Sequence, residues 1–408
     1  MSNFNLWLLL AGLITVFSCI VTGYKPYKNS SLLKIAPGNA DFAFRFYHQL
    51  AVEATNKNII FSPLSISTAF ALLSLGAKNT TLSQLLSGLG FNQTEISEQE
   101  IHAGFRHLLH MLNHLGADIE LSIGNALFTH EQFKLLKKFL ADAKHFYQSD
   151  VFPTNFKNLV EAKKKINSYI EEKTHGKLVD VVKGLDPDVI MVLVNYIFLK
   201  AYWENPFNSE NTQEDDFFVD EETKVTVSMM NKDSNFKSYY DKDLSCEVVQ
   251  LPYKGNLSAL FILPEQGKLK LVEDALRADV VSKWLHSLEI RRLAFYLPRF
   301  SLTGSYDIGE IFKKLGVTQL FTDHADLSGI SQKPNLKVSK FVISVENPFN
   351  SENTQEDDFF VDEETKVTIS MMNKDSNFKS YYDKDLSCEV VQLPYKGNLL
   401  ALFILPEH

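Results

Sequence analysis

One stretch of this chain occurs twice. Residues 204–265, which begin ENPFNSENTQEDDFF and end LFILPE, return as residues 346–407, displaced by 142 positions. The copies differ at two of their 62 positions, Val227 against Ile369 and Ser258 against Leu400. A solenoid needs at least three copies of a shorter unit, and this sequence has no third copy. The sequence therefore predicts one duplicated segment inside an otherwise non-repeating chain.

The composition is that of a globular protein with a large core. The chain has 408 residues, of which 45% are apolar and 12% aromatic. This is enough for one large domain or two smaller ones. The net charge of −9 argues against a general nucleic-acid-binding protein. No apolar run after the N-terminus is long enough to span a bilayer, so neither nucleic acid nor a membrane is an expected partner.

Residues 1–23 are predicted to be a secretory signal peptide. The stretch from Leu6 to Gly23 reads LWLLLAGLITVFSCIVTG, an apolar core followed by small residues. The first cationic side chain is Lys25, so the usual basic start is missing and an uncleaved membrane anchor is the alternative. The apolar core is short for a bilayer span, which favours cleavage and an extracellular protein.

Cysteine use and glycosylation motifs are compatible with secretion. Cys19 lies at the signal boundary, and Cys388 is the copy of Cys246, so the unduplicated mature chain has one cysteine and no disulfide framework. No Cys/His spacing suits a zinc ion, and we expect neither a metal nor a cofactor. Four Asn-X-Ser/Thr motifs give candidate N-glycosylation sites at Asn29, Asn79, Asn92 and Asn256.

Helical patterns come first along the chain and hairpin patterns later. Apolar periodicity predicts helices over 39–53, 65–75, 101–115, 132–147, 160–173, 273–287 and 306–315. Strands are predicted over 58–61, 119–127, 190–199, 225–230, 247–251, 257–263 and 293–297. The histidines of the third helix, His102, His107, His110 and His114, are expected on a solvated or mixed face. This order predicts an α+β protein with mixed sheets.

The strand over 190–199 is the strongest single signal. It reads IMVLVNYIFL, apolar throughout except for Asn195, which is typical of a strand covered on both faces. A buried amide without hydrogen-bond partners costs about 1–3 kcal/mol. Asn195 is therefore predicted to be a structural polar anchor inside a sheet.

Three motifs resemble the serpin family. They are NIIFSPLSIS at 58–67, NYIFLKAYWENPF at 195–207 and ADLSGI at 325–330. The wording of 35–47, IAPGNADFAFRFY, is similar to the secreted α1-antitrypsin-like group of that family. The resemblance covers 35–340 in register, which we take as the serpin domain.

The resemblance implies a fold of three sheets, about nine helices and an exposed reactive-centre loop. A serine protease cuts that loop, which then inserts into the main sheet and traps the enzyme, so the inhibitor needs no catalytic residue of its own. Four positions match structural residues of the family. Ser62 and Ser65 match its shutter serines, Asn195 its shutter asparagine and Trp203 its breach tryptophan.

The sequence departs from the family after Lys340. The family continues with a strand that contains a histidine, a hinge, a run of small residues with the scissile bond, and two core strands. Here residues 341–345 lead directly into the second copy, and 341–408 contain no run of Ala, Gly and Thr. We therefore expect no reactive centre, a C-terminally incomplete serpin fold, and a shutter that lacks one hydrogen-bond partner. A duplication in the gene and an error in joining exon copies both explain the second copy.

Two function hypotheses follow. By family the chain is a secreted serine-protease inhibitor, expected to be non-inhibitory as written because the bait loop is missing. The alternative is a non-inhibitory extracellular carrier of a small hydrophobic ligand, since some serpins carry steroid or thyroid hormone. An enzyme is not expected, because the sequence shows no GxSxG, HExxH, P-loop or Rossmann motif.

Heparin is a further candidate partner, and we expect a monomer. Arg291, Arg292 and Arg299 flank a predicted strand, and Lys163, Lys164 and Lys165 form a run. An ordinary solvated surface is the competing interpretation for both groups.

Overall fold

The structure is a computed structural model of the chain. It describes residues 13–14, 31–53, 59–113, 119–176, 178–186, 188–218, 224–254, 257–299, 308–346, 354–360, 366–372 and 399–401. Most of the predicted signal peptide, Asn29, Asn256 and most of the second copy lie outside these ranges. None of the helices within the ranges is both long and apolar enough to cross a membrane.

Nine α-helices occur within the described ranges. They are α1 (Ser31–Glu53), α2 (Pro63–Ser74), α3 (Asn79–Gly88), α4 (Glu98–Leu112), α5 (Lys137–Tyr147), α6 (Leu159–Lys173), α7 (Leu269–Ala275), α8 (Ala278–Ser287) and α9 (Ile308–Lys314). Together with the sheets below, they confirm the predicted α+β class.

The first sheet has the strand order β10-β4-β2-β3. Its members are β10 (Lys340–Glu346), β4 (Met191–Ala201), β2 (Ile119–His130) and β3 (Asp150–Thr154). The pair β2–β4 is antiparallel over eleven residues, from Ile119↔Ala201 to Thr129↔Met191, whereas β10–β4 and β2–β3 are parallel.

The second sheet has the order β1-β13-β8-β7-β6-β5, and β9 also pairs with β6. Its strands are β1 (Leu13–Ile14), β13 (Leu399–Ala401), β8 (Leu257–Pro264), β7 (Cys246–Tyr253), β6 (Lys224–Asp241), β5 (Gln213–Phe218) and β9 (Glu289–Pro298). A separate two-stranded sheet joins β11 (Thr354–Phe360) to β12 (Lys366–Met372). The first copy of the repeat thus supplies four strands of the second sheet, β5 to β8.

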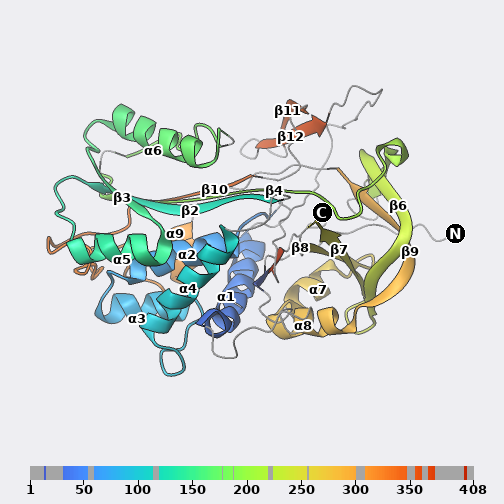
Figure 1. Ribbon diagram of the computed structural model, residues 1–408, viewed down its shortest axis with the longest axis horizontal. Helices are drawn as coiled ribbons and strands as arrows, with labels where there is room; N and C mark the ends of the chain where they lie inside the picture. The colour runs from blue at the N-terminus through green and yellow to red at the C-terminus, as the bar shows by residue number, and fades with distance from the viewer. Residues whose placement is uncertain are drawn as a thin grey trace.

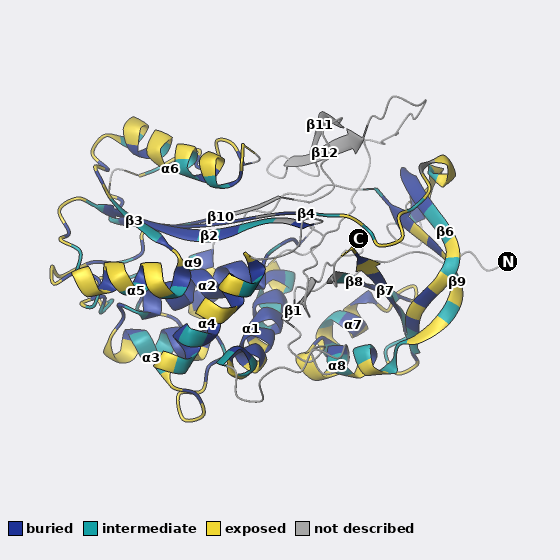
Figure 2. Ribbon diagram, viewed as in Figure 1, coloured by how far each residue is buried: buried dark blue, intermediate teal, exposed yellow. Residues whose placement is uncertain are grey.

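Helices cover both faces of the first sheet (Figure 1). Helices α1, α2, α4 and α5 lie on one face, and α6 lies on the other, where Ile166 and Ile170 join a smaller core with Phe128 and Val194. Helix α2 is buried along its whole length and forms the centre of the larger core (Figure 2). Its Phe70 ring stacks on Phe312 of α9 at a centroid distance of 3.7 Å.

The structure corrects several predicted elements. Helix α1 begins eight residues before the predicted start and contains Pro37, and Asn39 is buried within it. The predicted helix over 273–287 is two helices, since Leu276 and Arg277 between them are extended and Leu276 turns into the core. Helix α3 was not predicted at all.

Two further predictions near the N-terminal half were wrong or too long. His102 is buried rather than solvated, and its Nδ1 lies 2.6 Å from the Tyr147 hydroxyl of α5. The strand predicted over 58–61 is not a strand in the part that the structure describes. Residues 59–61 contain only an isolated bridge at Ile59. In contrast, β4 and β8 match the predicted ranges within two residues.

Candidate functional site

The centre of the first sheet holds a polar pair in an apolar strand. Asn195 of β4 lies opposite Asn125 of β2, and both side chains are buried. The amide nitrogen of Asn195 donates to the Oδ1 of Asn125 at 2.8 Å and to the backbone oxygen of Gly124 at 3.2 Å. The Oδ1 of Asn195 and the Nδ2 of Asn125 have no partner. The one polar side chain of this strand is therefore buried and only partly satisfied, and its role as a structural anchor stays a prediction.

The N-terminus of α2 brings the two predicted serines together. Ser62 is the N-cap of α2, with Pro63 at the first helical position, which needs no N–H donor. The hydroxyl of Ser62 accepts a hydrogen bond from the backbone N–H of Ser65 at 3.3 Å. The hydroxyl of Ser65 is itself buried without a partner. No direct bond between these serines and Asn195 occurs among the described contacts.

Strand β10 lies beside β4 and is fixed at its start. Ile343 is opposite Asn195 in the parallel register. The hydroxyl of Ser339 accepts from the backbone N–H of Ile190 at 3.0 Å, and Lys340 donates to the backbone oxygen of Gly184 at 2.6 Å. The Phe341 ring lies 5.0 Å from the Phe70 ring of α2. Residues that begin the departure from the serpin pattern thus occupy a full strand of the main sheet.

The next described strands after β10 belong to the second copy. In the pair β11–β12, Gln355 lies opposite Met371. In the first copy, the corresponding residues Gln213 and Met229 lie opposite each other in the pair β5–β6. The copy therefore forms its first hairpin in the register of the original, in a two-stranded sheet of its own.

Trp203 lies just beyond the C-terminal end of β4, where the chain enters the first copy. Its indole stacks on Tyr253 of β7 at a centroid distance of 3.8 Å, and Phe207 and Phe261 contact its edges at 6.4 Å and 6.3 Å. The predicted breach tryptophan thus joins the two sheets through residues of the first copy.

Two of the three arginines predicted to bind heparin, Arg291 and Arg292, are paired with carboxylates that offset their charge. Arg291 forms an ion pair with Glu247, and Arg292 forms one with Asp233 at 3.0 Å. Arg299 is partly buried, which lowers the pKa of its guanidinium, and its Nε has no partner among the described residues. In the lysine run, Lys163 pairs with Asp180 at 3.1 Å and Lys165 donates to the Pro153 oxygen at 2.8 Å. Heparin binding by these residues stays a prediction.

Two of the four glycosylation motifs lie in the described part of the chain. Asn79 and Asn92 are both exposed. The amide of Asn79 donates to Asp326 at 2.7 Å, and the side-chain oxygen of Asn92 accepts from the backbone N–H of Thr94 at 3.1 Å. Glycosylation at these two exposed positions stays a prediction.

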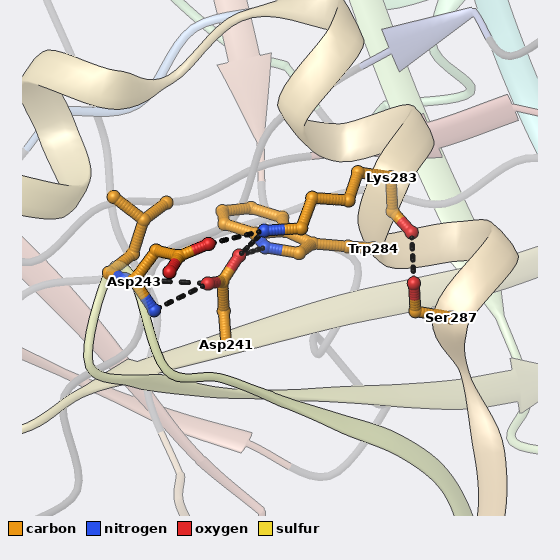
Figure 3. A network of polar contacts seen from close by, with 6 residues as sticks. Asp241, Asp243, Lys283, Trp284 and Ser287 are labelled. Atoms are coloured by element: carbon orange, nitrogen blue, oxygen red, sulfur yellow. Dashed lines mark hydrogen bonds and ion pairs between the residues drawn. The ribbon is translucent and has the colours of Figure 1, made fainter.

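Sequence analysis missed the polar network that ties the first copy to α8 (Figure 3). The Asp241 carboxylate, almost fully buried at the end of β6, accepts from the indole N–H of Trp284 at 2.7 Å and from Lys283 at 3.0 Å. Burial acts to raise the pKa of Asp241, but these bonds and the backbone N–H of Asp243 outweigh it and hold that pKa below its usual value. Only the long-range pairing of β6 with α8 could have revealed this network.

The described residues contain no candidate metal site. No group of three or more His, Cys, Asp or Glu side chains there could hold a metal ion. Cys246 is buried, which raises the pKa of its thiol to about 12 and keeps it protonated at neutral pH.

Comparison with known proteins now decides the family. The family model described as Serpin (serine protease inhibitor) matches residues 37–345 and, separately, 341–408. The chain is 50% identical over 307 residues to alpha-1-antiproteinase 2 of Equus caballus, covering 75% of this chain and 73% of that protein. This chain is a serpin. It belongs to the α1-antitrypsin-like group, which the motifs over 35–340 had predicted.

Two solved serpin structures show the same fold. Cleaved kallistatin in complex with heparin has a TM-score of 0.70 and 42% identity, covering 83% of this chain and 97% of that one. Human thyroxine-binding globulin in complex with thyroxine has a TM-score of 0.77 and 34% identity, covering 93% of this chain and all of that one. The relatives thus include an antiproteinase and a thyroxine-binding globulin.

Proposed function

We propose that this serpin is a secreted member of the α1-antitrypsin-like group that does not trap proteases in its present form. Residues 35–340 form the serpin domain, 1–23 the signal peptide and 346–407 a duplicate of 204–265. Ser62, Ser65, Asn195 and Trp203 have structural roles, and the chain has no catalytic activity of its own. It acts as a monomer and needs no cofactor.

One observation supports the loss of inhibition. Strand β10 is paired with β4 up to Glu346, and the next described residues, from Thr354, are already paired with β12 in a hairpin of the second copy. Trapping requires a long segment that is exposed, cleavable and able to insert as a new strand. A segment committed to its own hairpin does not meet that requirement.

Incubation with trypsin-like and chymotrypsin-like serine proteases tests this proposal. We expect no SDS-stable complex on a denaturing gel and undiminished protease activity. A chimera in which residues 341–408 are replaced by the C-terminal region of an inhibitory relative is the matched control, and it should form the complex. An SDS-stable complex of the unchanged chain would overturn the proposal.

Secretion is tested in cultured cells. The full chain should appear in the medium and shift to lower mass after glycosidase treatment, and the exposed Asn79 and Asn92 should each contribute, so that Asn79→Gln and Asn92→Gln each remove one step. Retention of the full chain in the cell, with no mass shift, would contradict an extracellular protein.

A carrier of a small hydrophobic ligand is the second candidate. It is favoured by the likeness to thyroxine-binding globulin, which covers 93% of this chain. A ligand that binds only the folded state adds about 2.7 kcal/mol of stability at one hundred times its Kd. Thyroxine and cortisol at increasing concentration should then raise the melting temperature, whereas an unchanged midpoint with both would eliminate these two ligand classes.

A further inference from the structure

Strand β8 is an interior strand by its burial. The consecutive side chains of Ala259, Leu260, Phe261 and Ile262 are 1%, 1%, 4% and 0% exposed. Neighbouring side chains of a strand point to opposite faces, so both faces of β8 are covered. Such a strand is stable when both of its edges are also paired, because an unpaired backbone N–H or C=O in an apolar environment is costly.

Only one edge of β8 is paired by the first copy. Strand β7 pairs along its whole length, from Tyr253↔Leu257 to Cys246↔Pro264. On the other edge the described residues supply one strand, β13, which is part of the second copy. The register there is Leu400↔Ser258 and Ala401↔Ala259, and the pairing is parallel.

That register equals the offset of the repeat. Leu400 and Ala401 each lie beside the residue that they correspond to in the first copy, because both pairs are 142 positions apart. In a parallel pairing without any shift, identical side chains form ladders along the sheet, an arrangement that packs apolar residues well.

We propose that β13, the terminal strand of the second copy, closes the open edge of β8 in register on its own parent strand and thereby stabilises the second sheet. The free edge of β8 is thus paired with a strand of the same chain, β13. In the sequence, the stretch 399–405 that begins with β13 reads LLALFIL and contains no charged or polar residue. The second copy then has a structural role.

One of the two differences between the copies supports this role. Where the parent has Ser258, the copy has Leu400, which lies opposite Ser258 in the sheet. The change makes the added strand fully apolar. It also destroys the Asn-Leu-Ser motif, so no glycan can be attached at Asn398 beside the docked strand.

The far side of β13 depends on the proposed removal of the signal peptide. Residues 13–14 form β1, which pairs with β13 through Leu13↔Leu400 and Ile14↔Leu399. Once 1–23 are cleaved, β13 becomes the last strand of the sheet. The pairing of β13 with β8 does not depend on whether the chain inhibits proteases. The pairing is measured by cross-linking and inhibition by complex formation, so either can fail without the other.

Engineered cross-links test the register in the full chain. Neighbouring parallel strands lie about 4.8 Å apart, within the Cα separation that a disulfide spans. In a background with Cys19→Ser, Cys246→Ala and Cys388→Ser, the pair Ser258→Cys with Leu400→Cys should oxidise within one chain and give a monomeric band of changed mobility on a non-reducing gel. The matched control, Ser258→Cys with Ala401→Cys, is one residue out of register and places the second thiol on the opposite face, so it should stay reduced.

Three results would overturn the proposal. They are equal cross-linking of the two pairs, no cross-linking of either, and cross-links found only between chains. A second readout is thermal unfolding of Ala401→Pro, which removes an N–H from the ladder and should lower the melting temperature. Asp385→Pro, at a position of the second copy outside all described strands, is its control, and equal midpoints for the two variants would also count against the inference.

Discussion

At the residue scale, the side chain of Asn195 uses only its donors. Its nitrogen makes two hydrogen bonds, whereas its oxygen has none, and the nitrogen of Asn125 beside it is also unpaired. Each such atom costs roughly 1–3 kcal/mol when buried. The serpin resemblance predicts a shutter that is short of one partner after the loss of a histidine strand, and the shutter role of Asn195 stays a prediction.

A donor at position 343 should repair this deficit. The parallel register places position 343 beside Asn195. We expect Ile343→His to raise the free energy of unfolding by about 1 kcal/mol at pH 8, because the neutral imidazole offers an N–H to the Asn195 oxygen. Urea unfolding measures the change. Ile343→Phe supplies a ring without a donor, and an equal gain from it would show that packing, rather than the hydrogen bond, is responsible.

Asp241 should make the stability of this serpin depend on acid pH. Its pKa is lower in the folded chain than the value of about 3.9 that an unfolded chain has. The stabilisation is therefore complete above about pH 5 and is lost as the pH falls through the unfolded value and then through the lower folded-state pKa. We expect Asp241→Asn to cost about 1–3 kcal/mol at pH 7 and to flatten the loss of stability between about pH 5 and 2.

Asp243→Asn is the matched control for this measurement. The Asp243 carboxylate lies 3.2 Å from the same Lys283, but its side chain is 85% exposed. An exposed ion pair contributes about 0–1 kcal/mol, so this variant should behave much like the unchanged chain. If both variants had the same pH profile, the buried bonds to Asp241 would not be the cause.

At the element scale, local apolar patterns predicted the strands, but they did not predict which residues of distant elements contact one another. The apolar run of β4 was sufficient to place it inside a sheet, but its hydrogen-bond partner Asn125 lies 70 residues away in the sequence. The break between α7 and α8 depends on Leu276 entering the core, which periodicity cannot reveal because the apolar pattern continues through it. The hairpin β11–β12 shows the converse, since the same local sequence reproduces the register of β5–β6.

The arginines of β9 illustrate how pairing between elements changes a prediction. Because Arg291 and Arg292 each face a carboxylate from β7 or β6, their charge is offset. We expect heparin-Sepharose to release this serpin below about 0.2 M salt, since few uncompensated cations give a shallow salt dependence. Asp233→Asn frees Arg292 and should move elution to higher salt, whereas elution of the unchanged chain well above that concentration would contradict the expectation.

At the scale of the whole molecule, two nearly identical segments occupy different surroundings. The first copy is joined at both ends to the folded domain, and β6 pairs with β9 over ten residues, from Met229↔Pro298 to Ser238↔Glu289. The second copy is preceded by Val345, where the first has Trp203. Identical residues should therefore contribute unequally to stability.

Paired truncations of one tyrosine measure this inequality. Tyr253 is buried and stacks on Trp203, so Tyr253→Ala should cost about 3–5 kcal/mol, as other buried aromatic truncations do. The same change in the second copy, Tyr395→Ala, has no tryptophan before it to lose and should cost less than about 0.5 kcal/mol. Urea unfolding of the two variants in parallel gives both values. Two results would contradict this expectation: equal losses of stability in the two variants, or no loss for Tyr253→Ala. Either would mean that the second copy can replace the first in the fold, so that the surroundings of the two copies do not determine their contributions to stability.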